Sequence, residues 1–254
     1  MPMIEQLCAA LSHAACSDAV RGVVVTGRGR YYSAGADLSS VLTFRRPSHL
    51  VSQLRDTNQG LFDSFIKFPK PIVAAVNGPA FGAAVTSATL MDAVVASETA
   101  TFSLPFAKYG VPPEGCSSVV LKELIGEECA IRMMGTENWA PTAFEAASLG
   151  LIQEVVQGGR EKLVDRATEL CIARMSADAK RRFNDAERTK LLIVNAEESA
   201  ALANAFVSTS FLSAMYRFNL KRNKPATAYA FLLANALLPL WQPEPVIPVL
   251  LGTR

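Results

Sequence analysis

Histidine and paired cysteine are scarce in this sequence. It has two histidines, His13 and His49, and none of its five cysteines forms a Cys-x-x-Cys pair. A histidine-rich metal centre, a zinc knuckle and a thioredoxin-like redox motif are therefore excluded, and a Ser-His-Asp triad is not expected. We expect no metal site, and five reduced, mostly buried thiols in an intracellular protein.

Charge is also sparse: 19% of the 254 residues are charged, the formal net charge is +2, and 50% of the residues are hydrophobic. A nucleic-acid-binding protein usually has a strongly basic face, so the near-zero net charge argues against that function. The charged content lies below the roughly 25% typical of globular domains. This deficit predicts surface that is buried between subunits, or an unusually apolar segment.

The sequence has no recognisable signal peptide, peroxisomal address or membrane span. Its first residues lack a basic region followed by an apolar one, and its last four, Leu-Gly-Thr-Arg, are not of the Ser-Lys-Leu type. The most apolar run, residues 226–241, is interrupted by Pro239 and is shorter than the roughly 20 residues that cross a bilayer. We expect this run to form a buried helix.

Short β-branched runs alternate with amphipathic stretches along the chain before the pattern becomes mostly helical. This order predicts an α/β core with a helical C-terminal subdomain. Strands are expected over residues 22–27, 71–77, 93–96, 101–104 and 151–156. Helices are expected from residue 4 onward and over residues 50–68, 80–91, 119–125, 127–134, 142–149, 161–175 and 180–223.

Two loops of small residues, 33–38 and 78–84, follow the first two predicted strands. Small side chains leave backbone N–H groups accessible to a ligand oxygen, so the N–H groups of Ala36 and Ala83 could form an oxyanion hole. Taken alone, such residues more often serve turns and helix packing. A dinucleotide fingerprint at 27–32 is not expected, because Tyr32 stands in place of its third glycine.

A third candidate is Glu114, which stands between Pro113 and Gly115 just before a predicted helix. A partly desolvated carboxylate at this point could act as a general base, because desolvation raises the pKa of a carboxyl group. The alternative is a solvated glutamate that caps the helix that follows.

In their order and spacing, these stretches resemble the enoyl-CoA hydratase/isomerase (crotonase) superfamily over residues 4–156. The resemblance is carried by residues 23–27, 33–38, 70–79 and 92–97, and by the pattern Ala143, Glu145, Ala146, Leu149, Gly150 and Leu151. It implies a crotonase-like ββα spiral core and an acyl-CoA substrate whose thioester enolate the protein stabilises. The coenzyme A thioester is then the substrate, and no cofactor is expected.

The same resemblance assigns roles to individual residues. The N–H groups of Ala36 and Ala83 fall at the two oxyanion-hole positions. Hydratases of the superfamily use two glutamates, at the positions of Thr86 and Phe106 here, so hydration is disfavoured. The segment 113–118 is instead similar to peroxisomal-type Δ3,Δ2-enoyl-CoA isomerases, in which this glutamate is the base. Contacts to CoA or the acyl group are expected from Ser33, Ala34, Gly35, Ala36, Asp37, Leu38, Gly82, Thr86 and Phe106.

The expected activity is isomerisation of 3-enoyl-CoA to trans-2-enoyl-CoA in fatty acid oxidation, with Glu114 carrying a proton from C2 to C4. Residues 1–180 are expected to form the core, without the strand pair that usually opens it. Residues 181–254 are expected to form a helical region for oligomerisation or for covering the acyl pocket. The resemblance implies a homotrimer or hexamer and a peroxisomal or mitochondrial location. The alternatives are a non-catalytic acyl-CoA-binding or scaffold protein, and a hydratase that uses other residues.

Overall fold

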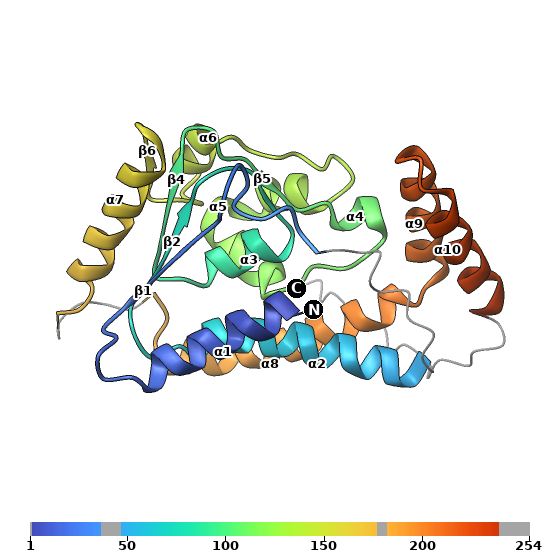
Figure 1. Cartoon of the computed structure of the whole chain (residues 1–254), viewed down its shortest axis with the longest axis horizontal. Helices are drawn as coiled ribbons and strands as arrows, with labels where there is room; N and C mark the ends of the chain where they lie inside the picture. Colours follow the sequence, from blue (N-terminus) through green and yellow to red (C-terminus); the bar gives the residue numbers. More distant parts are fainter. Residues whose placement is uncertain (1, 37–46, 177–181, 239–254) are drawn as a thin grey trace.

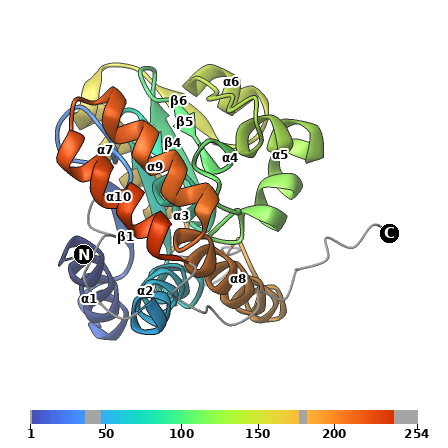
Figure 2. The same ribbon diagram turned by 90° about the vertical axis from the view of Figure 1, so that its right-hand side faces the viewer.

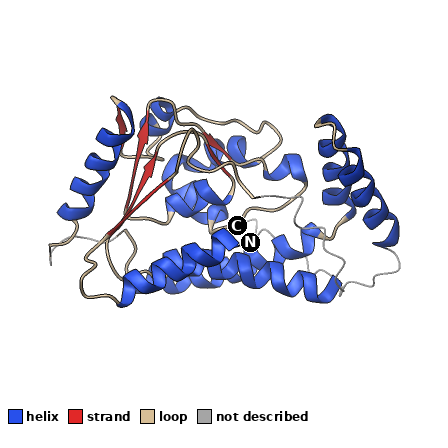
Figure 3. Ribbon diagram, in the orientation of Figure 1, coloured by secondary structure: helices blue, strands red, loops and turns tan. Residues whose placement is uncertain are grey.

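The computed structural model, which describes residues 2–36, 47–176 and 182–238, contains a parallel sheet of four short strands. In spatial order its strands are β1 (Val23–Thr26), β2 (Ile72–Val76), β4 (Ala93–Ser97) and β6 (Glu154–Val156). Val23 pairs with Ile72, and Val73 with Ala93. Two further strands, β3 (Ala80–Phe81) and β5 (Phe102–Ser103), form a separate parallel pair. Figure 3 shows the strands gathered in one part of a largely helical molecule.

Helices separate the strands and then continue alone after β6, which confirms the predicted α/β core with a helical C-terminal subdomain. The helices are α1 (Pro2–Cys16), α2 (Pro47–Ile66), α3 (Ala83–Thr89), α4 (Phe106–Tyr109), α5 (Ser117–Met134), α6 (Ala143–Ser148), α7 (Gly159–Ala173), α8 (Asp185–Phe206), α9 (Thr209–Lys221) and α10 (Pro225–Leu237).

The two faces of the sheet are buried against different helices. Val73 and Ala75 of β2 cluster with Leu163 and Ala167 of α7, whereas Ile72 and its alternate neighbours on β2 belong to the main core. Successive strand residues point to opposite faces, so one run of apolar residues fills both layers. Figure 1 shows α7 on one side of the sheet and α3 and α5 on the other, with α1, α2 and α8 running below.

The helix predicted over residues 80–91 was wrong at its start. The N–H of Ala80 donates to the carbonyl of Thr101 at 2.8 Å, and the N–H of Gly82 donates to the carbonyl of Ser103 at 2.9 Å. These bonds hold residues 80–81 extended as β3, and Gly82, with φ of 56°, turns the chain into α3 at Ala83. The small residues of this loop therefore form a strand, a turn and a helix start in succession.

Two expectations about the helical tail needed correction. The run predicted over residues 180–223 is two helices, because the hydroxyl of Ser208 accepts a hydrogen bond from the N–H of Phe211 and starts a new helix. The apolar run beyond it forms helix α10, but Tyr229 and Leu233 are each 58% exposed within the single chain. Figure 2 shows α9 and α10 side by side.

The cysteines differ from the expectation in one respect. All five are free thiols, but only Cys116 and Cys171 are buried, whereas Cys16 is exposed and the other two are half-buried. No helix in the described part of the chain is long and apolar enough to cross a membrane.

Candidate functional site

The two loops of small residues lie side by side at the carboxyl ends of β1 and β2. The N–H of Ser33 donates to the carbonyl of Pro79 at 3.4 Å, and Ser33 forms an isolated bridge with Ala80. A side chain at Gly35 would place its Cβ 3.3 Å from the Cβ of Phe81. The segment that leads to Ala36 thus runs along the segment that leads to Ala83.

Asn77 fixes the chain where it leaves β1. Its Oδ1 accepts a hydrogen bond from the N–H of Gly27 at 2.8 Å, and its Nδ2 donates to the carbonyl of Gly29 at 2.9 Å. Both glycines therefore belong to a turn that is tied to the end of β2. This contact places the first small-residue loop against the second.

The backbone N–H of Ala83 opens the first turn of α3. The N–H groups of Val85 and Thr86 both donate to the carbonyl of Gly82, at 2.8 and 3.2 Å. The first N–H groups of a helix have no partner within the helix. No hydrogen bond from the N–H of Ala83 is formed within residues 2–36, 47–176 and 182–238, so this donor is available to a ligand oxygen.

The side chain of Glu114 also lies next to the start of α3, although it comes from a different part of the chain. The next two residues, Gly115 and Cys116, have φ of 64° and 62°, and this left-handed turn leads into α5. Glu114 is 8% exposed, and its Oε1 lies 3.8 Å from the position that a Cβ would occupy on Gly82. The alternative of a solvated glutamate is therefore wrong, and the carboxyl group lies beside the peptide that precedes Ala83.

A side-chain amide on α2 orients the carboxyl group. The Nδ2 of Asn58 donates to Oε2 of Glu114 at 2.5 Å. The Oδ1 of Asn58 accepts from the hydroxyl of Ser199, on α8, at 2.8 Å. Because Oδ1 is occupied by a donor, the amide is held with its NH2 group facing Glu114.

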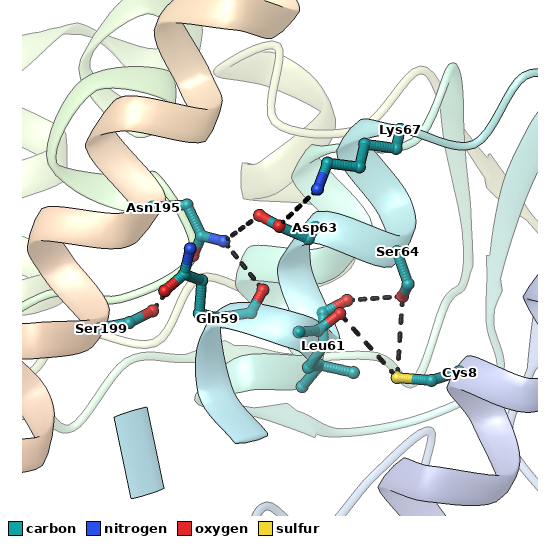
Figure 4. Close-up of polar contacts among 9 residues, drawn as sticks. Cys8, Gln59, Leu61, Asp63, Ser64, Lys67, Asn195 and Ser199 are labelled. Atoms are coloured by element: carbon teal, nitrogen blue, oxygen red, sulfur yellow. Dashed lines mark hydrogen bonds and ion pairs between the residues drawn. The ribbon is translucent and has the colours of Figure 1, made fainter. Parts of the chain in front are cut away.

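The polar contacts continue between α2 and α8 behind this amide (Figure 4). Ser199 lies 3.3 Å from Oδ1 of Asn195, and Nδ2 of Asn195 donates to the carbonyl of Gln59 at 3.0 Å and to Asp63 at 2.9 Å. Asp63 is paired with Lys67 at 2.7 Å. Asn195 and Ser199 are fully buried, so these hydrogen bonds satisfy groups that would otherwise be costly to bury.

The surroundings of Glu114 alter its acidity. Burial raises the pKa of Glu114 from 4.5 to about 7; the hydrogen bond from Asn58 acts against this rise, and the charge of Glu198 adds to it. A carboxyl group that titrates near neutral pH can both accept a proton and return it at working pH. The site therefore holds a candidate general base next to a free backbone donor.

The other predicted contact residues occupy varied positions. Ser33, Gly35, Gly82 and Ala83 are half-buried, and Ala34 and Ala36 are exposed. Thr86 is fully buried and its hydroxyl donates to the carbonyl of Ala83 at 3.3 Å, whereas Phe106 is 5% exposed and belongs to the main core. Asp37 and Leu38 lie outside the described residues. The described residues contain no group of three histidine, cysteine or acidic side chains that could hold a metal ion.

Sequence reasoning missed three residues around Glu114: Asn58, Glu198 and Ser199. They lie on helices 56 to 85 residues away in sequence, and no local motif marks them. One signal was present: Asn195, Glu198 and Ser199 recur at spacings of three and four, which places polar groups on one face of a helix. That face is buried, and a buried polar face on a helix indicates a specific hydrogen-bonding role.

Comparisons with known proteins identify relatives of this chain. The family model for enoyl-CoA hydratase/isomerase matches residues 1–226. Enoyl-CoA delta isomerase 2 of Homo sapiens is 34% identical over 230 residues, which cover 87% of this chain and 57% of the human protein. Enoyl-CoA delta isomerase 3, peroxisomal, of Mus musculus is 34% identical over 206 residues, which cover 79% of this chain and 65% of the mouse protein. The matched part is thus less than two thirds of either relative.

A solved structure is similar as well. The structure of Pseudomonas aeruginosa OdaA superimposes with a TM-score of 0.73 and 25% sequence identity, over 85% of this chain and 87% of that chain.

Proposed function

The chain belongs to the enoyl-CoA hydratase/isomerase family, with its crotonase fold, and we propose that it isomerises 3-enoyl-CoA to trans-2-enoyl-CoA. The observation that carries this proposal is the buried carboxyl group of Glu114, next to the peptide that precedes the free N–H of Ala83. The two relatives named as enoyl-CoA delta isomerases support it.

In the proposed reaction, the carboxylate of Glu114 accepts a proton from C2 of the 3-enoyl thioester. The electrons of that C–H bond form a dienolate, and negative charge develops on the thioester oxygen. Backbone N–H groups of Ala83 and Ala36 donate to this oxygen, and each such donor contributes roughly 3 kcal/mol in the transition state. The protonated Glu114 then returns the proton to C4, and the double bond moves to C2–C3.

One carboxyl group suffices for this reaction because no water is added. The two positions at which the resemblance expects hydratase glutamates hold Thr86 and Phe106, and both side chains are buried. The hydroxyl of Thr86 is engaged with the carbonyl of Ala83, and Phe106 has no polar group to activate water. These two residues favour isomerisation over hydration.

The test is an assay of the purified protein with a 3-enoyl-CoA, read by formation of the conjugated thioester. We expect Glu114→Gln to lower kcat by roughly 10²–10⁴-fold, the usual contribution of a general base. Glu128→Gln, which removes an exposed carboxylate of α5, is the matched control and is expected to leave the rate unchanged. Equal rates for Glu114→Gln and the native protein would remove Glu114 from the mechanism.

Two further measurements separate the alternatives. A hydratase would convert crotonyl-CoA to a 3-hydroxyacyl-CoA, and we expect no such product. Calorimetric titration with a CoA ester tests binding without chemistry: binding without isomerisation would favour an acyl-CoA-binding module, and the absence of both would favour a scaffold.

Assembly and location are further parts of the proposal. The exposed apolar side chains of α10, among them Leu232 and Leu233, support burial of this helix between subunits of a homotrimer or hexamer. Sedimentation of the purified chain tests this. The mouse relative named as peroxisomal supports a peroxisomal or mitochondrial location, which imaging of the tagged full-length protein tests.

A further inference from the structure

Glu198, on α8, binds two backbone N–H groups at the start of α5. Its Oε2 accepts from the N–H of Cys116 at 2.7 Å, and its Oε1 accepts from the N–H of Ser118 at 3.1 Å. The side chain of Cys116, the N-cap residue of α5, makes no capping hydrogen bond. The acceptor for these orphan donors therefore comes from a helix 80 residues further along the chain.

These two hydrogen bonds hold the turn that carries Glu114. Cys116 has φ of 62°, a conformation that costs a residue with a side chain roughly 1–2 kcal/mol. The preceding residue, Gly115, adopts a similar φ against the ring of Phe62. The direction in which the side chain of Glu114 points depends on the conformation of this turn. It therefore also depends on the hydrogen bonds that Glu198 accepts from the turn.

Glu198 also brings a like charge close to the base. Glu198 is 9% exposed as a residue. Burial raises the pKa of its carboxyl group, while the hydrogen bonds from Ser118 and Cys116 act in the opposite direction. The positive end of α5 likewise favours the carboxylate form. Its charge raises the pKa of Glu114.

The other titratable groups packed around this pair do not supply that charge. The thiol of Cys116, on the turn, has a pKa raised to about 12 by burial first and then by Glu198 and Asp63, so it is neutral. Asp63, on α2, is paired with Lys67 at 2.7 Å. Among the described residues, Glu198 is thus the carboxylate whose charge acts on Glu114.

We propose that Glu198 is a positioning residue for Glu114: through its two hydrogen bonds to the backbone of Cys116 and Ser118 it holds the turn that carries the base. Glu198 acts through the turn and through the field at Glu114 rather than by contact with the substrate. Its effect on turnover rests on the proposed function, whereas its effect on the acidity of Glu114 does not.

The direct test is titration of the Glu114 carboxyl group, followed by infrared or carboxyl carbon NMR signals that disappear in Glu114→Gln. In the native protein we expect a midpoint near 7. Glu198→Gln is expected to lower this midpoint, while burial, the largest cause of the shift, keeps it above the ordinary value of 4.5. Glu198→Asp keeps the charge and is expected to keep the midpoint closer to that of the native protein. Glu197→Gln removes the neighbouring but exposed carboxylate of α8 and is the matched control.

An unchanged Glu114 midpoint in a folded Glu198→Gln variant would overturn the proposal. Glu198→Asp keeps the negative charge, so it decides the question even where Glu198→Gln does not fold. A folded Glu198→Asp variant whose Glu114 midpoint falls to the ordinary value of 4.5 would overturn the proposal equally.

Turnover supplies a separate readout. With a 3-enoyl-CoA, Glu198→Gln is expected to shift the acid limb of kcat/KM to lower pH and to lower kcat, with KM within about twofold of the native value. If Glu198 had a purely structural role, its replacement would lower activity without shifting the acid limb of the kcat/KM profile. A native protein whose Glu114 titrates near 7 but that isomerises no 3-enoyl-CoA would contradict the proposed function and leave the Glu198 coupling intact.

Discussion

The carboxyl group of Glu114 lies against Gly82: its Oε1 is 3.8 Å from the position that a Cβ would take on that glycine. Gly82 is the N-cap residue of α3, and the free N–H of Ala83 follows directly. A proton acceptor and a hydrogen-bond donor thus lie beside the same peptide, although Glu114 and Ala83 are 31 positions apart in the chain. An enolate needs both groups, one for the proton that leaves carbon and one for the charge that appears on oxygen.

The first prediction concerns the pH dependence of the reaction. Glu114 accepts a proton only as a carboxylate, and burial raises its pKa to about 7. Activity on a 3-enoyl-CoA is therefore expected to fall about tenfold for each pH unit below this value, because the carboxylate fraction falls by that factor. The measurement is kcat/KM over the acid range. A rate that stays constant down to the ordinary glutamate pKa of 4.5 would show that another group is the base.

The second prediction concerns the amide that contacts the base. The hydrogen bond from Asn58 lowers the pKa of Glu114, so Asn58→Ala is expected to move the acid limb to higher pH. The shift is about one pH unit for a hydrogen bond worth about 1.4 kcal/mol. Ser199→Ala should also move the acid limb to higher pH, but by less. It removes only the hydroxyl that holds the side-chain amide of Asn58 in its orientation.

Thr189→Ala is the control for Ser199→Ala. Thr189 also lies on α8, but its hydroxyl donates to the carbonyl of Asp185 within the same helix. We expect Thr189→Ala to leave the acid limb of the kcat/KM profile at the pH of the native protein. A limb that moves equally in Thr189→Ala and Ser199→Ala would mean that the effect comes from α8 as a whole.

The third prediction concerns Gly115. Its φ of 64° disfavours any side chain, and a Cβ would lie 2.4 Å from Cε1 of Phe62. Gly115→Ala is expected to destabilise the fold by about 2–3 kcal/mol and to displace Glu114. Denaturant unfolding measures the loss. Gly60→Ala is the matched control: Gly60 lies in α2 with open space around it, and alanine there should stabilise by about 0.5–1 kcal/mol.

The fourth prediction links the base to stability. Because the folded pKa of Glu114 lies above 4.5, the native state binds more protons than the unfolded state between pH 4.5 and about 7. This contribution to stability is fully present below pH 4.5 and is lost as pH rises through about 7, with a total of about 3 kcal/mol.

Glu114→Gln has no ionisable group at this position, so its stability should not decrease as the pH rises through about 7. We expect the variant to be more stable than the native protein at about pH 8, and the difference to shrink at about pH 5. Thermal unfolding at both pH values measures this. A difference that is the same at both would mean that Glu114 is not held in the buried, charged form at high pH.

Local sequence patterns were sufficient for the four strands of the main sheet. The β-branched run of β2 predicts a strand buried on both faces, and its residues are indeed buried throughout. The segment before α3 was the exception, because Ala80 and Phe81 have no strand pattern of their own. They are extended only because Thr101 and Ser103 supply carbonyl groups beside them.

The sequence by itself determined the four strands of the main sheet and the three stretches in which Ala36, Ala83 and Glu114 stand. Only the tertiary structure decided that Glu114 is buried rather than solvated, and that Asn58 and Glu198 surround it. The pKa of a carboxyl group depends on the water that is removed from it and on the charges and donors nearby. These come from α2 and α8, helices far from Glu114 in the chain, so no pattern around residue 114 contains them.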